Sequence, residues 1–147
     1  MISPAASRMA FFSRSVGNEK SAERVNSPGM ISAVFHNRLK KGMMLQTDPT
    51  VIYGIGPKFD GDIKKADLRR DTPYNTYMRF GLPPTPIAMP SKESLLAAAQ
   101  PAVSNALYFV ARGDGSSQFS TNLKEHEAAV DRYQRNPAKS ASKPVRK

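Results

Sequence analysis

Residues 45–54, Leu-Gln-Thr-Asp-Pro-Thr-Val-Ile-Tyr-Gly, bring an amide, a carboxylate, two hydroxyl groups and a phenol together around a proline. These groups exchange hydrogen bonds with polar ligands, and the apolar residues between them would hold the segment to the domain. We therefore expect a binding patch for a neutral, hydroxyl-rich ligand, with Gln46, Thr47, Asp48 and Tyr53 as its candidate residues. The alternative is that Asp48 only caps a helix and that Gln46 is solvated.

A second patch of the same character occupies residues 74–77, where two tyrosines flank Asn75 and Thr76. Aromatic rings beside amide and hydroxyl groups suit sugar rings, which have an apolar face and a rim of hydroxyls. The alternative places both tyrosines in the core with their hydroxyls in water.

Other reactive side chains give weaker signals. Asn122 and His126 are four residues apart and share a helix face. A lone histidine on a surface helix is more often solvated or capping than catalytic, and the same holds for His36. No His, Asp and Glu set has metal-ligand spacing and no glycine-rich phosphate loop is present, so neither a metal nor another cofactor is expected.

The composition limits the class of protein. A net charge of +10 and a pI near 10.1 indicate attraction to an anionic partner. Part of this charge lies in residues 136–147, which are predicted to form a disordered basic tail. The basic residues lack interleaved aromatics, so nucleic acid is not an expected partner. There is no cysteine, no apolar run long enough for a membrane span and no signal peptide pattern.

Apolar periodicity predicts a helix from residue 30, with Ile31, Val34, Phe35 and Leu39 inward and Arg38 off that stripe, ending at Gly42. Asp48 and Pro49 are typical of an N-cap and first helical residue, so residues 50–53 are predicted to be helical; their β-branched content makes a strand the alternative.

Further along, a short helix is expected at residues 64–70, and Thr72-Pro73 predicts a second capped helical turn over residues 74–77. Four prolines in residues 81–90 predict an extended, stiff connection. Ser91 then caps a helix whose buried face is predicted to contain Leu95, Leu96 and Ala99.

The last elements are a hairpin and a helix. Residues 106–112 read as a strand, followed by a Gly-Asp-Gly turn and a second strand at 118–120. Asn122 with Glu125 predicts a helix start. The inner side of this helix is predicted to contain Leu123, Glu127, Val130 and Tyr133 or Gln134. The fold class is therefore α+β: several short helices with one β-hairpin and proline-stiffened loops.

Together these residues resemble one family, the endolytic murein transglycosylases, also called YceG-like. The resemblance is collinear over residues 34–133, about two thirds of the chain. Its strings include residues 34–39 (VFHNRL), 45–54, 72–77 (TPYNTY), 81–84 (GLPP), 107–111 (LYFVA) and 119–123 (FSTNL), with His126.

The resemblance implies a bacterial cell-wall enzyme that cuts peptidoglycan between N-acetylmuramic acid and N-acetylglucosamine and leaves 1,6-anhydro ends. In such a reaction a glutamic acid protonates the glycosidic oxygen and the muramyl C6 hydroxyl attacks. It further implies that Gln46, Thr47, Asp48, Asn75 and Asn122 line the substrate cleft. The expected partners are glycan strands and other cell-wall synthesis proteins, at the periplasmic face of the inner membrane.

One departure concerns the acid. In the family a Glu-Lys-Glu-Thr string with the catalytic glutamate precedes a Glu-Arg pair, which Glu23-Arg24 resembles. Here residues 13–16 are Ser-Arg-Ser-Val, no acid precedes Glu19, and the flanks of Glu19 do not match, so no catalytic residue is assigned.

We therefore divide the chain into three parts: an atypical segment 1–29, a partial catalytic domain 30–135 and the tail 136–147. The atypical segment is interpreted as the result of a truncated, frame-disrupted or misassigned start. An inactive glycan-binding fragment is the alternative function.

Overall fold

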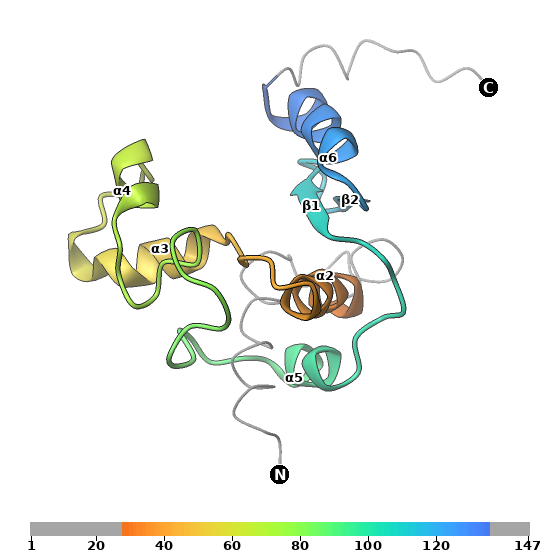
Figure 1. Cartoon of the computed structure of the whole chain (residues 1–147), viewed down its shortest axis with the longest axis horizontal. Coiled ribbons are helices and arrows are strands. Elements are labelled where there is room, and N and C mark those ends of the chain that lie inside the picture. The colour runs from red at the N-terminus through yellow and green to blue at the C-terminus, as the bar shows by residue number, and fades with distance from the viewer. Residues whose placement is uncertain (1–27, 136–147) are drawn as a thin grey trace.

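A computed structural model describes residues 28–135 of the chain (Figure 1). The predicted segment 1–29, apart from its last two residues, and the tail 136–147 lie outside the described residues. The helices are α2 (Pro28–Lys40), α3 (Asp48–Ile55), the 3₁₀ turn η1 (Gly56–Lys58), α4 (Lys65–Arg69), α5 (Lys92–Ala99), α6 (Leu123–Val130) and the π-helical turn η2 (Asp131–Arg135). Strands β1 (Tyr108–Ala111) and β2 (Ser117–Ser120) form one antiparallel hairpin, so the predicted α+β class is confirmed.

Helix α2 lies at the centre of the molecule, between α5 on one side and the hairpin on the other (Figure 1). The predicted apolar stripe is confirmed: Ile31, Val34 and Phe35 are fully buried, and Ile31 and Phe35 form a core cluster with Leu45 and Ala98. The described part of the helix starts at Pro28, the first described residue, and so includes two residues before the predicted start.

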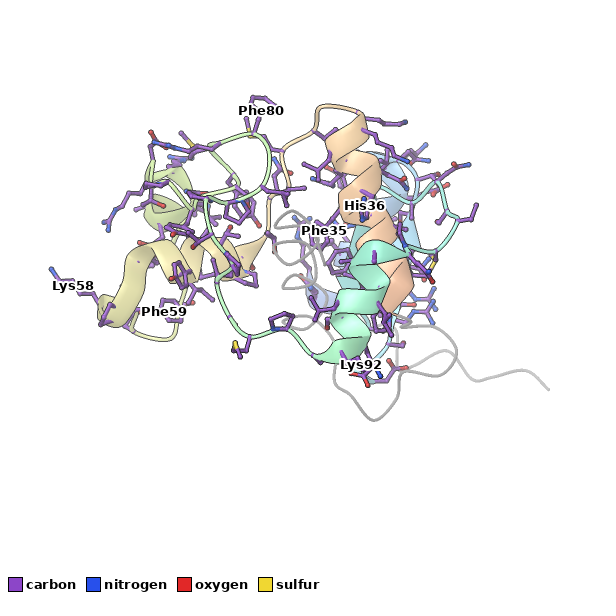
Figure 2. The ribbon with its side chains drawn as sticks, turned by 90° about the horizontal axis from the view of Figure 1, so that it is seen from below. Phe35, His36, Lys58, Phe59, Phe80 and Lys92 are labelled. Carbon is purple, nitrogen blue, oxygen red and sulfur yellow. The ribbon has the colours of Figure 1, made fainter. Side chains whose placement is uncertain are left out.

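The off-stripe position predicted for Arg38 is wrong, since its side chain is only 6% exposed. Arg38 follows Val34 by four residues and Phe35 by three, so it shares their inward face. His36 is likewise not solvated, because its Nε2 donates a 2.9 Å hydrogen bond to the Ala98 carbonyl of α5. Figure 2 shows α2 and α5 side by side, with Phe35 and His36 labelled on α2.

Helices α3 and α4, with the turns that follow them, form a lobe that we call the α3–α4 lobe (residues 46–80), to one side of α2 (Figure 1). Lys58 and Phe59 lie at its far end in Figure 2. The helical prediction for residues 50–53 is confirmed and the strand alternative is wrong. Asp48 is the first residue of α3 rather than its cap: Thr47 holds the cap position, without a side-chain cap bond.

The predicted helical turn over residues 74–77 is wrong, because these residues form a series of turns. The cause is the buried amide of Asn75. It donates to the carbonyls of Leu68 (3.1 Å) and Arg70 (2.7 Å) and accepts from the backbone N–H of Tyr77 (2.9 Å). Asparagine side chains that satisfy nearby backbone groups in this way compete with helix formation.

Helix α5 begins as predicted, with the Ser91 side chain accepting a hydrogen bond from the Ser94 N–H. Its predicted inner face is right at Leu95, which packs against the core cluster, and wrong at Leu96 and Ala99. Ser94, Ala97 and Ala98 are the buried residues, whereas Leu96 is 56% exposed. Small side chains let the backbone of α5 come close enough to α2 for the His36–Ala98 hydrogen bond, which bulky leucines at the contact would prevent.

The hairpin pairs Tyr108 with Ser120 and Phe109 with Phe119. Phe109 joins the hairpin to α2, since its ring meets Phe35 edge-on at a centroid separation of 5.9 Å. The connecting turn has Gly113 and Gly115 at φ of 90°, a conformation that favours glycine.

Helix α6 packs on the hairpin and starts as predicted at Asn122, whose side chain accepts from the Glu125 N–H at 2.9 Å. Its predicted inner face is wrong except at Val130 and Tyr133. Ala129 is buried and His126, Val130 and Tyr133 are half-buried, while Leu123 is 54% exposed.

No helix in residues 28–135 is long and apolar enough to cross a membrane.

Candidate functional site

A groove of about 750 Å³ runs between the α3–α4 lobe on one side and the β1–β2 hairpin with α6 on the other. Its floor is formed by Val34, Phe35 and Arg38 of α2 together with Leu45. The first wall comes from the start of α3 and Tyr77; the second wall comes from β1 and α6. A concave site of this size is typical of small-molecule and oligosaccharide binding.

The first wall joins the two patches that the sequence predicted separately. Gln46 donates from its backbone N–H to the Thr76 carbonyl (3.2 Å), and Thr47 donates from its N–H to the Thr76 hydroxyl (3.0 Å). The hydroxyls of Thr50 and Thr76 are 2.8 Å apart, and Thr50 also donates to the Thr47 carbonyl. These threonines are buried, so they hold the wall in place rather than present hydroxyls to a ligand.

Gln46 has an unusual backbone conformation next to this network. Its φ is +49°, in the left-handed region that residues other than glycine seldom adopt. The side chain is exposed and lines the groove. Backbone strain that the surroundings enforce is frequent where a side chain must be presented to a ligand.

Asp48 and Tyr77 complete the first wall. The Tyr77 hydroxyl donates a 2.6 Å hydrogen bond to Asp48 Oδ1. Burial raises the pKa of Tyr77 above its ordinary value, and the Asp48 carboxylate raises it further, so the phenol is neutral at physiological pH. The remaining acceptor capacity of the exposed Asp48 carboxylate is available to ligand hydroxyls.

Arg38 connects the floor of the groove to two other chain segments. Its guanidinium donates to the carbonyls of Leu107 (2.6 Å) and Met44 (2.7 Å), and it lies 4.7 Å from the centroid of the Tyr108 ring. Burial lowers the pKa of Arg38, but an arginine stays charged at physiological pH. The contact with Tyr108 is a cation–π interaction that fixes the aromatic ring beside the second wall.

The second wall carries one imidazole among apolar and aromatic groups. The His126 ring stacks on Tyr108, with centroids 5.0 Å apart and planes 22° apart. Leu123, Glu127 and Val130 of α6 line the same side.

The seven site residues predicted from the sequence fall into two groups. Gln46, Thr47 and Asp48 line the groove, whereas the other four do not. Tyr53, 44% exposed, pairs its ring with Tyr74 outside the groove, and Asn122 caps α6 on the exposed surface. Asn75 and Thr76 are buried beside a smaller hollow of about 190 Å³.

The site residues predicted from the sequence did not include the groove residues Arg38, Tyr108 and His126. A helical-wheel reading would have placed Arg38 on the inner face of α2. His126 was noted for sharing a helix face with Asn122, but that spacing does not separate a ligand-binding histidine from a solvated one. Within residues 28–135 no group of three or more His, Asp and Glu side chains could hold a metal ion.

The sequence model of the YceG-like family matches residues 18–132 of this chain. The chain belongs to the YceG-like family. The match begins within the segment 1–29 that the sequence patterns set apart.

Three relatives illustrate the membership. The endolytic murein transglycosylase of Bacillus subtilis (strain 168) is 48% identical over 103 residues, covering 70% of this chain and 28% of its own. The endolytic murein transglycosylase of Streptococcus pneumoniae serotype 2 is 32% identical over 118 residues, covering 76% of this chain and 21% of its own. The crystal structure of a YceG-like protein from Listeria monocytogenes superposes with a TM-score of 0.73 at 40% identity, covering 82% of this chain and 38% of that one. This YceG-like chain therefore spans between 21% and 38% of the length of these relatives.

Proposed function

We propose that this chain binds a peptidoglycan glycan strand in the groove and that the groove serves lytic cleavage of the strand between N-acetylmuramic acid and N-acetylglucosamine. The observation that carries the proposal is the groove of about 750 Å³ with Gln46, Asp48 and Tyr77 on one wall and Tyr108 and His126 on the other. Relatives in the same family are endolytic murein transglycosylases, which supports murein as the ligand.

The two walls match the chemistry of an amino sugar polymer. Aromatic rings cover the apolar faces of pyranose rings, while carboxylate and amide groups bind hydroxyl and acetamido groups. Tyr77 and Tyr108 supply such rings on opposite walls, and Asp48 and Gln46 supply the polar groups. The guanidinium of Arg38 is held in the floor by two backbone carbonyls and by the Tyr108 ring, so it supports the groove through contacts within the chain.

Cleavage requires a carboxyl group that is held protonated near neutral pH, which burial achieves. Among the described residues, the carboxylates that line the groove are Asp48 and Glu127, and both are exposed. Asp48 accepts a hydrogen bond from Tyr77, which suits a group that binds hydroxyls rather than one that donates a proton. This favours binding by the described residues and motivates the second candidate, a glycan-binding fragment without catalysis.

Binding is tested by sedimentation of the purified chain with murein sacculi at raised salt, which screens adhesion driven by the net charge of +10. We expect the chain to be retained and Gln46→Ala and Asp48→Asn to weaken retention. Matched controls are Gln100→Ala and Asp62→Asn, whose side chains are exposed outside the groove. Equal retention of the groove variants and the controls would show that the groove does not bind murein.

Cleavage is tested by incubating the same protein with sacculi and searching for 1,6-anhydromuropeptides by mass spectrometry. Their release by the wild-type chain, acting by this proposal at the periplasmic face of the inner membrane, supports the enzyme. Retention without release supports the non-catalytic glycan-binding fragment. If product appears, Glu127→Gln and Asp48→Asn show whether either groove carboxylate supplies the proton.

A further inference from the structure

His126 is held more firmly than an ordinary surface histidine. Its ring stacks on Tyr108 at 5.0 Å, and Arg38 lies 4.7 Å from the centroid of the same tyrosine ring. Arg38 is in turn fixed by two carbonyl groups, at 2.6 and 2.7 Å. A series of contacts therefore runs from Arg38 in the floor of the groove through the Tyr108 ring to the imidazole of His126.

The two ring nitrogens of His126 differ in their surroundings. Nδ1 is buried and has no hydrogen-bond partner among the described residues. This leaves Nε2 as the nitrogen available to a ligand in the groove, which His126 lines. A buried N–H without an acceptor is rarer in proteins than a buried acceptor without a donor, so the proton of the neutral ring belongs on Nε2.

The groups around the ring keep it neutral. Burial lowers the pKa of His126, and the positive charge of Arg38 lowers it further, against a smaller opposing effect of Glu127. Tyr108 contributes a phenol ring stacked on the imidazole. A neutral imidazole with its proton on Nε2 is a hydrogen-bond donor without net charge.

We propose that His126 is a substrate-binding residue of the groove that donates a hydrogen bond from Nε2 to an acetamido carbonyl or hydroxyl oxygen of the glycan strand. Asp48 and Gln46, which line the same groove from the other wall, would supply acceptors to the same glycan strand. The inference rests on the proposed function, since it names a contact to the same ligand.

Two replacements separate hydrogen bonding from packing. His126→Phe keeps an aromatic ring for Tyr108 but removes both nitrogens, and His126→Gln places an amide N–H near the position of Nε2. We expect His126→Phe to keep the melting temperature and to weaken the affinity for sacculi about three- to ten-fold, and His126→Gln to restore most of it. Equal affinity of His126→Phe and wild type would overturn the inference.

A measurement on the wild-type chain does not depend on how these variants fold. The chain has two histidines, so ¹H–¹⁵N spectra of the imidazole rings report on His126 with His36 as an internal reference. We expect the Nε2–H tautomer at pH 7 and a shift of the His126 signals on addition of a soluble peptidoglycan tetrasaccharide. His36, which is bonded to Ala98, should not move.

The outcomes distinguish the two proposals. Retention of the wild-type chain by sacculi with unmoved His126 signals would overturn the role of His126 and leave the proposed function in place. No retention and no shift would overturn both. The Nδ1–H tautomer in the free protein would also contradict the inference, because Nε2 could then not donate.

Discussion

The hydroxyl of Tyr77 donates a 2.6 Å hydrogen bond to Asp48 Oδ1 across 29 residues of sequence. This bond links two polar patches of the α3–α4 lobe and fixes the direction of the carboxylate at the edge of the groove. Because Asp48 is exposed and Tyr77 is partly buried, the tyrosine positions the acid rather than the reverse.

We expect Tyr77→Phe to lower the free energy of unfolding by about 0.5–1.5 kcal/mol, the net value of one hydrogen bond that water partly replaces. A double-mutant cycle with Asp48→Ala, measured by urea denaturation, should give a coupling energy of similar size. Tyr53→Phe is the control, since the Tyr53 ring contacts Tyr74 and Tyr53 lies outside the groove. Additive effects of the two replacements would show that the bond does not persist in solution.

The raised pKa of Tyr77 also predicts that the stability of the fold depends on pH in the alkaline range. Burial, aided by Asp48, raises the pKa of Tyr77 in the folded chain above the ordinary value near 10. The unfolded chain therefore loses this proton first as the pH rises, so the stabilisation is complete below about pH 10 and is lost above it. Absorbance near 295 nm should show that one of the five tyrosines ionises late or only with unfolding, and Tyr77→Phe should remove that component. Simultaneous ionisation of all tyrosines in the folded chain would contradict the burial of Tyr77.

Local signals in the sequence predicted most of the elements. The caps at Ser91 and Asn122 and the Gly-Asp-Gly turn act over a few residues, and they are where the patterns placed them. The stripe of α2 succeeded for a related reason, since apolar periodicity reports burial along one helix.

The errors share a different cause. Asn75 satisfies carbonyl groups at Leu68 and Arg70, and this arrangement prevents the helical turn that Thr72-Pro73 predicted. Arg38 can be buried because its guanidinium donates a hydrogen bond to the Leu107 carbonyl and lies against the Tyr108 ring, both about 70 residues away in the sequence. Leu96 is exposed because α5 presents alanines to α2. The α5 and Arg38 contacts join segments far apart in the sequence, and the Asn75 bonds depend on how the chain turns between residues 68 and 75, so periodicity and cap signals do not report them. Of these residues, Arg38 lines the groove.

Arg38 should not tolerate lysine. A lysine ammonium cannot reach the Leu107 and Met44 carbonyls with the fixed fork of a guanidinium, so one buried carbonyl loses its donor. We expect Arg38→Lys to lower the free energy of unfolding by about 1–3 kcal/mol in urea denaturation. Arg69→Lys, on the exposed side of α4, should change it little. Equal stability of Arg38→Lys and the wild type would mean that the guanidinium is not needed by the floor.

Gly54 should resist alanine even though it lies inside α3. Alanine in a helix is normally favoured over glycine by about 1 kcal/mol. At this position, however, a Cβ would lie 2.5 Å from the Thr72 hydroxyl oxygen. We expect Gly54→Ala to destabilise the fold by about 1–3 kcal/mol, as overpacking does. Thr72→Ala removes that oxygen, which has no hydrogen-bond partner among the described residues. The double variant should then be at least as stable as Thr72→Ala alone, and a double variant as unstable as Gly54→Ala would show that the clash lies elsewhere.

Gln46 allows stability and binding to be separated. Its φ of +49° costs a residue other than glycine roughly 1 kcal/mol, and asparagine tolerates this conformation better. We expect Gln46→Asn to keep or slightly raise the free energy of unfolding, because the backbone bond to the Thr76 carbonyl does not involve the side chain. The shorter amide should reach less far into the groove and weaken retention by sacculi, whereas Gln100→Asn should change neither quantity. If Gln46→Asn unfolds more easily but binds as before, the glutamine serves packing, and the first wall must hold its ligand through Asp48 instead.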